Sequence, residues 1–147
     1  MKKIISYAAS LLIVISVAAA PSSKIIQSFN ATFPNAKNVK WMDDKEGYFV
    51  SFYQDNNFEK VLYNKEGDFV CSWRYSEGKD LPTNILMILN KKYNADKIIG
   101  VTELTTQGNV TYDIKLNKGD KLYAVIMQSD GTITKEQKFD YQATQNN

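Results

Sequence analysis

Histidine is absent from all 147 residues of this sequence, and cysteine occurs once, as Cys71. Without histidine, Ser-His-Asp and Cys-His catalytic centres, imidazole zinc sites and histidine acid–base chemistry are excluded together. A single cysteine cannot form a bridge within the chain, so a disulfide framework is excluded as well. Cys71 lies in a strand-like segment without a basic neighbour on its own face, so we interpret it as a small buried apolar residue and expect no enzyme activity.

The sequence also has no strong charge of either sign. Its 18 basic and 16 acidic residues are interspersed and give a formal net charge of +2. Without a polybasic tract, neither nucleic acid nor a membrane surface is implied as a partner. The acidic segment DDKEG, residues 43–47, lacks the spaced ligands of an EF-hand, so we interpret it as a solvated hairpin turn. We therefore predict no metal site and no cofactor.

No apolar run is long enough to span a membrane, but a shorter one lies near the first residue. Residues 1–19 contain two lysines, an apolar run over residues 11–17 and then small residues, which is the pattern of a secretory signal peptide. Cleavage after Ala19 would place Val17 and Ala19 at the two small-residue positions. No cysteine follows the run, so we expect no stable membrane anchor and a periplasmic or secreted protein.

The sequence after residue 19 predicts the same order of elements twice, a helix followed by antiparallel strands. Apolar residues at helical spacing predict a helix over residues 22–33, capped by Ser22 or Ser23 and ended by Pro34. Strand-like segments follow around Trp41 and at residues 48–53, 58–63 and 69–75. A second helix over residues 82–93 precedes strand-like segments at residues 97–104, 109–116, 121–127 and 132–139.

This repetition, with a period of about 60 residues, predicts how the chain is organised. One unit covers residues 20–76 and the other covers residues 77–140, while residues 141–147 form a polar tail. Either unit alone would bury too little apolar surface to be stable, so the two are expected to share one domain. The predicted fold class is α+β, with a tandem helix-plus-antiparallel-meander repeat forming one sheet and both helices on one face.

Several segments resemble a known family. FPNAKNVKW, a spaced YFV, VLYNKEGDFV and a second helix opened by LP look like the PepSY-like, β-lactamase-inhibitor-protein-like family of exported bacterial proteins, common in Bacteroidetes. The resemblance covers nearly the whole chain after residue 19, and its aromatic and glycine positions specify a fold rather than an activity. It implies a protein similar in fold to a secreted inhibitor that grips its target enzyme on the open face of its sheet. No motif for particular inhibitory contacts is present.

The repeat predicts which side chains face the helices. In VTYDIK, residues 110–115, apolar and polar residues alternate, so the apolar ones should face the core. Aligning Gly67 with Gly131 transfers this alternation to the first unit, where the predicted core-facing residues are Tyr48, Val50, Phe52, Val61 and Tyr63. Trp41 and Trp73 are also expected to face inward. The residues left on the open face, our candidate partner-binding set, are Phe49, Ser51, Tyr53, Phe58, Lys60 and Leu62.

Two interpretations of this apolar set stay open. Its side chains either pack on one another across the strands and serve no partner, or form a binding surface, as exposed apolar patches with polar rims do. We therefore expect an exported, non-enzymatic protein-binding module that inhibits or regulates an envelope enzyme and whose partner is a protein of the cell envelope or exterior. The alternative is a small-ligand or calcium-dependent sensor, or an envelope-structure protein, using the same sheet.

Overall fold

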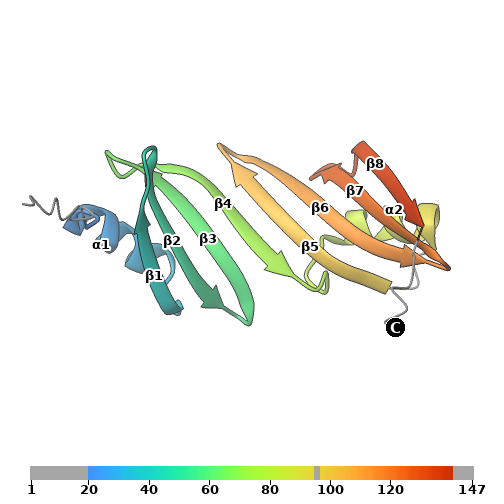
Figure 1. Ribbon diagram of the computed structural model, residues 1–147, viewed down its shortest axis with the longest axis horizontal. Coiled ribbons are helices and arrows are strands. Elements are labelled where there is room, and N and C mark those ends of the chain that lie inside the picture. Colours follow the sequence, from blue (N-terminus) through green and yellow to red (C-terminus); the bar gives the residue numbers. More distant parts are fainter. Residues whose placement is uncertain (1–19, 95–96, 141–147) are drawn as a thin grey trace, which may run out of the picture.

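The computed structural model describes residues 20–94 and 97–140, so the expected signal peptide and polar tail lie outside the described residues. Figure 1 shows the described elements in chain order. They are α1 (Ser23–Thr32), β1 (Lys37–Asp43), β2 (Gly47–Gln54), β3 (Asn57–Asn64), β4 (Phe69–Ser76), α2 (Thr83–Tyr93), β5 (Lys97–Thr106), β6 (Asn109–Lys118), β7 (Lys121–Gln128) and β8 (Ile133–Asp140). Neither described helix is long and apolar enough to cross a membrane.

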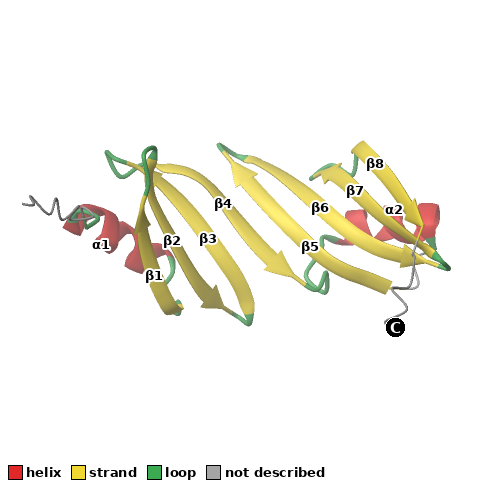
Figure 2. Ribbon diagram, viewed as in Figure 1, coloured by secondary structure: helices red, strands yellow, loops and turns green. Residues whose placement is uncertain are grey.

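The eight strands form one open antiparallel sheet in which spatial order follows chain order, from β1 to β8. Both helices lie behind the sheet in Figure 2, α1 at one end and α2 at the other. Each helix therefore precedes and covers its own group of four strands. The predicted α+β class and the two helix-plus-four-strand units are confirmed.

Local sequence explains where the helices begin and end. The Ser22 hydroxyl oxygen accepts a hydrogen bond from the backbone N–H of Ile25 at 3.4 Å, which caps α1 as expected. α2 begins directly after Pro82, whose missing N–H is not needed at a helix start. It ends at Asn94, which adopts the left-handed conformation with φ of 44°, a conformation that asparagine tolerates better than most residues.

Two separate hydrophobic clusters stabilise the sheet. In the first unit, Ile25 and Phe29 of α1 pack on helix-facing residues of β2 and β3, namely Tyr48, Val50, Phe52, Val61 and Tyr63. In the second unit, α2 packs on β5, β6 and β7 through residues that include Ile85, Leu89, Tyr112, Ile114, Val125 and Met127. The core-facing residues predicted from the alternation are therefore buried as expected.

Matching glycines bring each helix close to a turn of its own unit. Gly67 in the β3–β4 turn has φ of 94°, and a Cβ there would lie 2.9 Å from a side-chain carbon of Ile25. Gly131 in the β7–β8 turn has φ of 92°, and a Cβ there would lie 2.2 Å from Ile88. At each of these two positions glycine is required for two reasons, the left-handed backbone and the close approach of the helix.

The two units meet at β4 and β5, where the helix side of the sheet is polar. The Arg74 guanidinium donates to the Glu103 carboxylate at 2.8 Å, and Glu59 lies opposite Arg74 on β3. Burial raises the pKa of Glu59; the positive charge of Arg74 opposes this shift, and the negative charges of Glu103 and Asp55 add to it. No described residue of β4 belongs to either hydrophobic cluster.

Candidate functional site

Aromatic rings gather on the face of β2, β3 and β4 that lies away from the helices. Strand register places Tyr53 opposite Phe58, and Phe58 opposite Tyr75. The ring centroids of Tyr53 and Phe58 are 5.3 Å apart, and those of Phe58 and Tyr75 are 5.7 Å apart. Two further rings, Phe49 and Trp73, lie 6.0 Å apart on the same face. We refer to Phe49, Tyr53, Phe58, Trp73 and Tyr75 together as the aromatic patch.

The predicted faces of β2 and β3 are correct. Residues of the open face are also expected to be more exposed than Tyr48 and the other core-facing residues, and for Leu62 this expectation is wrong. Phe49 on β2 and Trp73 on β4 flank β3, and neighbouring strands lie about 4.8 Å apart. Their rings must therefore lean toward each other over β3, where Leu62 lies. Leu62 is only 5% exposed as a result, less than the core-facing Tyr48 at 9%. Tyr53 is 46% exposed, and Phe49 and Phe58 are half-buried.

Polar members of the candidate set lie within the patch. Ser51 pairs with Lys40 on one side and with Lys60 on the other, and Lys60 pairs in turn with Trp73. Ser51 and Lys60 are half-buried, and no ion pair is found for Lys40 or Lys60 within the described residues. The patch therefore combines apolar rings with two unneutralised ammonium groups.

The inward orientation expected for Trp73 was wrong. Tyr63, a core-facing residue, pairs with Phe69, whereas its neighbour Leu62 pairs with Cys71, so one extra residue at Val70 shifts the alternation. Such a bulge moves every later side chain of the strand to the opposite face. Sequence alternation alone therefore missed Trp73 and Tyr75 as members of the open face. Trp41 faces inward as expected, with its ring 5.4 Å from that of Phe29.

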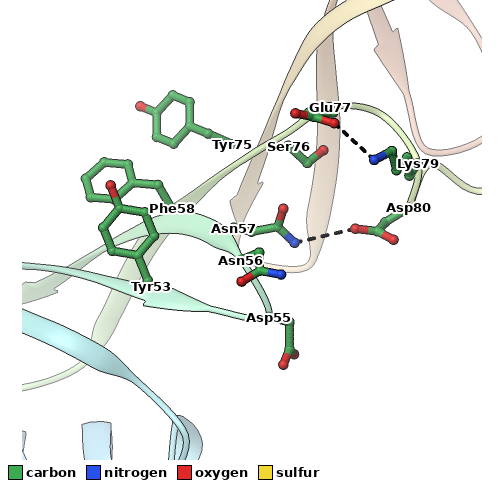
Figure 3. Close-up of a pocket in the computed structure, with 10 residues that line it drawn as sticks. All are labelled: Tyr53, Asp55, Asn56, Asn57, Phe58, Tyr75, Ser76, Glu77, Lys79 and Asp80. Atoms are coloured by element: carbon green, nitrogen blue, oxygen red, sulfur yellow. Dashed lines mark hydrogen bonds and ion pairs between the residues drawn. The ribbon is translucent and has the colours of Figure 1, made fainter.

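A cavity of about 640 Å³ opens where the aromatic patch reaches the β2–β3 turn. Figure 3 shows Tyr53, Phe58 and Tyr75 on one side of it and polar side chains of the turn and of the β4–α2 connection on the other. Asn57 donates from its side-chain amide to the Asp80 carboxylate at 3.4 Å, and Lys79 pairs with Glu77 at 3.1 Å. Two further depressions share lining residues with it, and Tyr53 lines all three.

The sheet offers little for metal or thiol chemistry. Within residues 20–94 and 97–140, no three His, Cys, Asp or Glu side chains are placed to hold a metal ion. Asp43 of the acidic turn is paired with Lys65 instead. Burial raises the pKa of the Cys71 thiol, which disfavours the reactive thiolate. Cys71 is thus a packed side chain next to Leu62 rather than a nucleophile.

By sequence, no family profile and no curated protein matches the chain. By structure, it is similar to a BLIP-like protein from Bacteroides fragilis, with a TM-score of 0.65 and 17% identity, covering 83% of this chain and 89% of that one. A DUF2874 family protein from Bacteroides ovatus matches with a TM-score of 0.63 and 18% identity, over 82% and 89% of the two chains. A protein from Bacteroides eggerthii described as periplasmic matches with a TM-score of 0.63 and 14% identity, over 86% and 94%. The chain therefore shares the fold of the Bacteroides DUF2874 and BLIP-like proteins, at low sequence identity.

Proposed function

We propose that this protein is an exported, non-enzymatic module that binds a protein of the cell envelope or exterior through the aromatic patch. The observation that supports this most is the position of the five rings. They lie on the side of the sheet away from both helices, and Tyr53 and Tyr75 remain 46% and 39% exposed. Tyrosine and tryptophan are enriched at protein interfaces because they contribute large contact area at low entropic cost.

The chemistry around the rings supports a protein as the partner. Leu62 and the half-buried Phe49 and Trp73 form a packed centre, which gives the patch a firm base. Lys40 on β1 supplies a cationic margin and Lys60 on β3 a cation among the rings, and neither makes an ion pair within the described residues. A hydrophobic centre with a charged margin is the usual anatomy of a protein interface. Contact residues would be Phe49, Ser51, Tyr53, Phe58 and Lys60, together with Trp73 and Tyr75.

Export and the absence of catalysis rest on separate support. The signal-peptide pattern of residues 1–19 and the likeness to a protein described as periplasmic both favour export. The lack of histidine and the unreactive Cys71 favour a non-enzyme. The likeness to a BLIP-like protein favours inhibition or regulation of an envelope enzyme as the outcome of binding.

Capture followed by reconstitution tests the proposal. A protein retained from envelope extract by residues 20–147 would be purified, and its affinity for the wild type and for two variants measured by calorimetry. Phe49→Ser removes one ring, and Lys60→Glu reverses a charge within the patch without touching a core. We expect each variant to weaken binding by about tenfold or more, as loss of a contact residue at an interface centre does.

A control on the other face makes the test specific. Met87 on α2 is 67% exposed, so Met87→Ser removes apolar surface away from the patch. Its affinity should equal that of the wild type, and all variants should melt cooperatively. A reconstituted complex that tolerates both Phe49→Ser and Lys60→Glu would contradict the proposed face. Inhibition is then scored by adding the module to the purified partner, if that partner is an enzyme.

A further inference from the structure

The cavity beside the β2–β3 turn differs in chemistry from the rest of the open face. Its volume of about 640 Å³ falls within the range of about 300–1,000 Å³ that is usual for sites that hold a small group. One wall is apolar and aromatic, formed by Tyr53, Phe58 and Tyr75, whose rings follow one another at 5.3 and 5.7 Å. The opposite wall comes from two chain segments that the Asn57–Asp80 hydrogen bond joins.

The charge of the cavity is opposite to that of the patch margin. Its lining carries three carboxylates, from Asp55, Glu77 and Asp80, and one ammonium group, from Lys79. Lys79 is paired with Glu77 at 3.1 Å. Neither Asp55 nor Asp80 makes an ion pair within the described residues; Asp80 accepts a hydrogen bond from the neutral Asn57 amide and interacts with the Arg74 charge only at longer range. Two carboxylates without an ion-pair partner among the described residues therefore line the same cavity as the three rings, and Figure 3 shows the residues of this lining.

We propose that this cavity receives an arginine side chain, presented by the protein partner that the aromatic patch binds. The proposal rests on the proposed function for its partner, but the cavity can be probed without that partner. A cation is attracted both by the faces of aromatic rings and by unpaired carboxylates, so the two walls favour the same ligand. A neutral ligand could pack on the rings and donate hydrogen bonds to the polar wall, but it would lack both the cation–π attraction and the charge attraction to the carboxylates.

Arginine fits better than lysine for two reasons. Its guanidinium is planar, so one face can stack on an aromatic ring. The N–H groups at its edge then donate hydrogen bonds, in the plane of the guanidinium, to carboxylates and side-chain amide oxygens. It is also more weakly hydrated than an ammonium group, so less hydration is lost when it enters a partly apolar cavity. The acceptors available on the polar wall include Asp55, Asn56 and Asp80. The partner would thus contact aromatic rings at the centre of the open face and carboxylates beside the β2–β3 turn.

The test is a titration of isotope-labelled residues 20–147 with acetyl-Gly-Arg-Gly-amide, followed by the amide NMR signals of Asn57 and Ser76. The matched control peptide carries citrulline, which has the shape of arginine but no charge. We expect saturable shifts with the arginine peptide and an affinity about fivefold lower or more with citrulline, because the cation–π and charge attractions are lost. The lysine peptide should bind more weakly than the arginine peptide.

Variants of the protein complete the design. Asp55→Asn with Asp80→Asn keeps the shape of the cavity and an oxygen for the Asn57 amide, and should weaken the arginine peptide by about fivefold or more. Glu46→Gln with Asp44→Asn removes the same charge from the β1–β2 turn at the other end of the hairpin, and should change nothing. Equal responses to arginine and citrulline, no saturable shift, or shifts caused by a neutral oligosaccharide instead would overturn the proposal. Protein capture that fails with Phe49→Ser would then still support the aromatic patch, because Phe49 does not line the cavity.

Discussion

Adjacent residues of β2 should respond in opposite ways to the same charge. Val50 is fully buried between α1 and the sheet, so Val50→Asp loses about 1.5–3 kcal/mol of apolar burial. The new carboxyl would also be buried without a partner, at a further cost of several kcal/mol. The sum is comparable with the whole stability of a domain, about 5–15 kcal/mol. We therefore expect Val50→Asp to unfold the first unit.

Ser51→Asp places the carboxylate on the open face between two lysines. Ser51 pairs across the sheet with Lys40 and with Lys60, neither of which has an ion-pair partner among the described residues. A cross-strand pair of opposite charges contributes about 0.2–1 kcal/mol. We expect Ser51→Asp to leave stability within about 1 kcal/mol of the wild type, on the stabilising side, and added salt to reduce the gain.

Urea unfolding of residues 20–147, followed by circular dichroism at neutral pH, measures both effects. The wild type and Ser51→Asp should share a cooperative transition with closely similar midpoints. Val50→Asp should show a much lower midpoint or no transition for the first unit. Equal midpoints for the two variants, or a larger loss with Ser51→Asp, would mean that the helix-facing and open faces of β2 have been exchanged.

Three further outcomes are expected from the same unfolding assay. Leu62→Ala should lower the free energy of unfolding by about 2–5 kcal/mol, although Leu62 faces away from the helices. Tyr53→Ala should change it by no more than about 1 kcal/mol. Comparable losses for the two variants would contradict the burial of Leu62 under the neighbouring rings. Gly131→Ala should destabilise the protein more than Gly108→Ala. Both glycines have positive φ, but only at Gly131 would the new Cβ meet another side chain. Equal losses of stability would leave backbone strain as the sole cause. Burial raises the pKa of Glu59, so the folded state holds that proton more tightly than the unfolded chain and ionised Glu59 opposes folding. Glu59→Gln should therefore raise the midpoint at neutral pH, and the gain should vanish as pH falls below the ordinary value of 4.5; a gain that is independent of pH would exclude this cause.

The fold could be predicted because helix spacing and glycine positions repeat. Gly67 and Gly131 occupy equivalent turns under equivalent helices, so aligning them transferred the clear alternation of β6 to β2 and β3 correctly. The face of Trp73 could not be predicted in this way, because a single extra residue at Val70 exchanges the two sides of a strand. Nothing in the local sequence distinguishes a regular strand from a bulged one there.

The candidate site was predicted in part for a related reason. The alternation of β6, transferred to β2, correctly assigned Tyr48, Val50 and Phe52 to the helix side, where they belong to the cluster of α1. The same reasoning fails on β4, which contributes to neither cluster and carries two of its three aromatic side chains, Trp73 and Tyr75, on the open face. The burial of Leu62 depends on rings from both neighbouring strands, and contacts between three strands cannot be read from one of them.

The polar junction between the two clusters has a consequence for cooperativity. The two hydrophobic clusters share no residue, and on the helix side β4 and β5 are linked by the Arg74–Glu103 pair rather than by apolar packing. Coupling between the halves therefore depends on the backbone hydrogen bonds between β4 and β5 and on open-face neighbours such as Trp73 and Leu104. We therefore expect the two halves to act as foldons joined along one strand pair, so that one half can open locally while the other, still paired with the rest of the sheet, keeps its core.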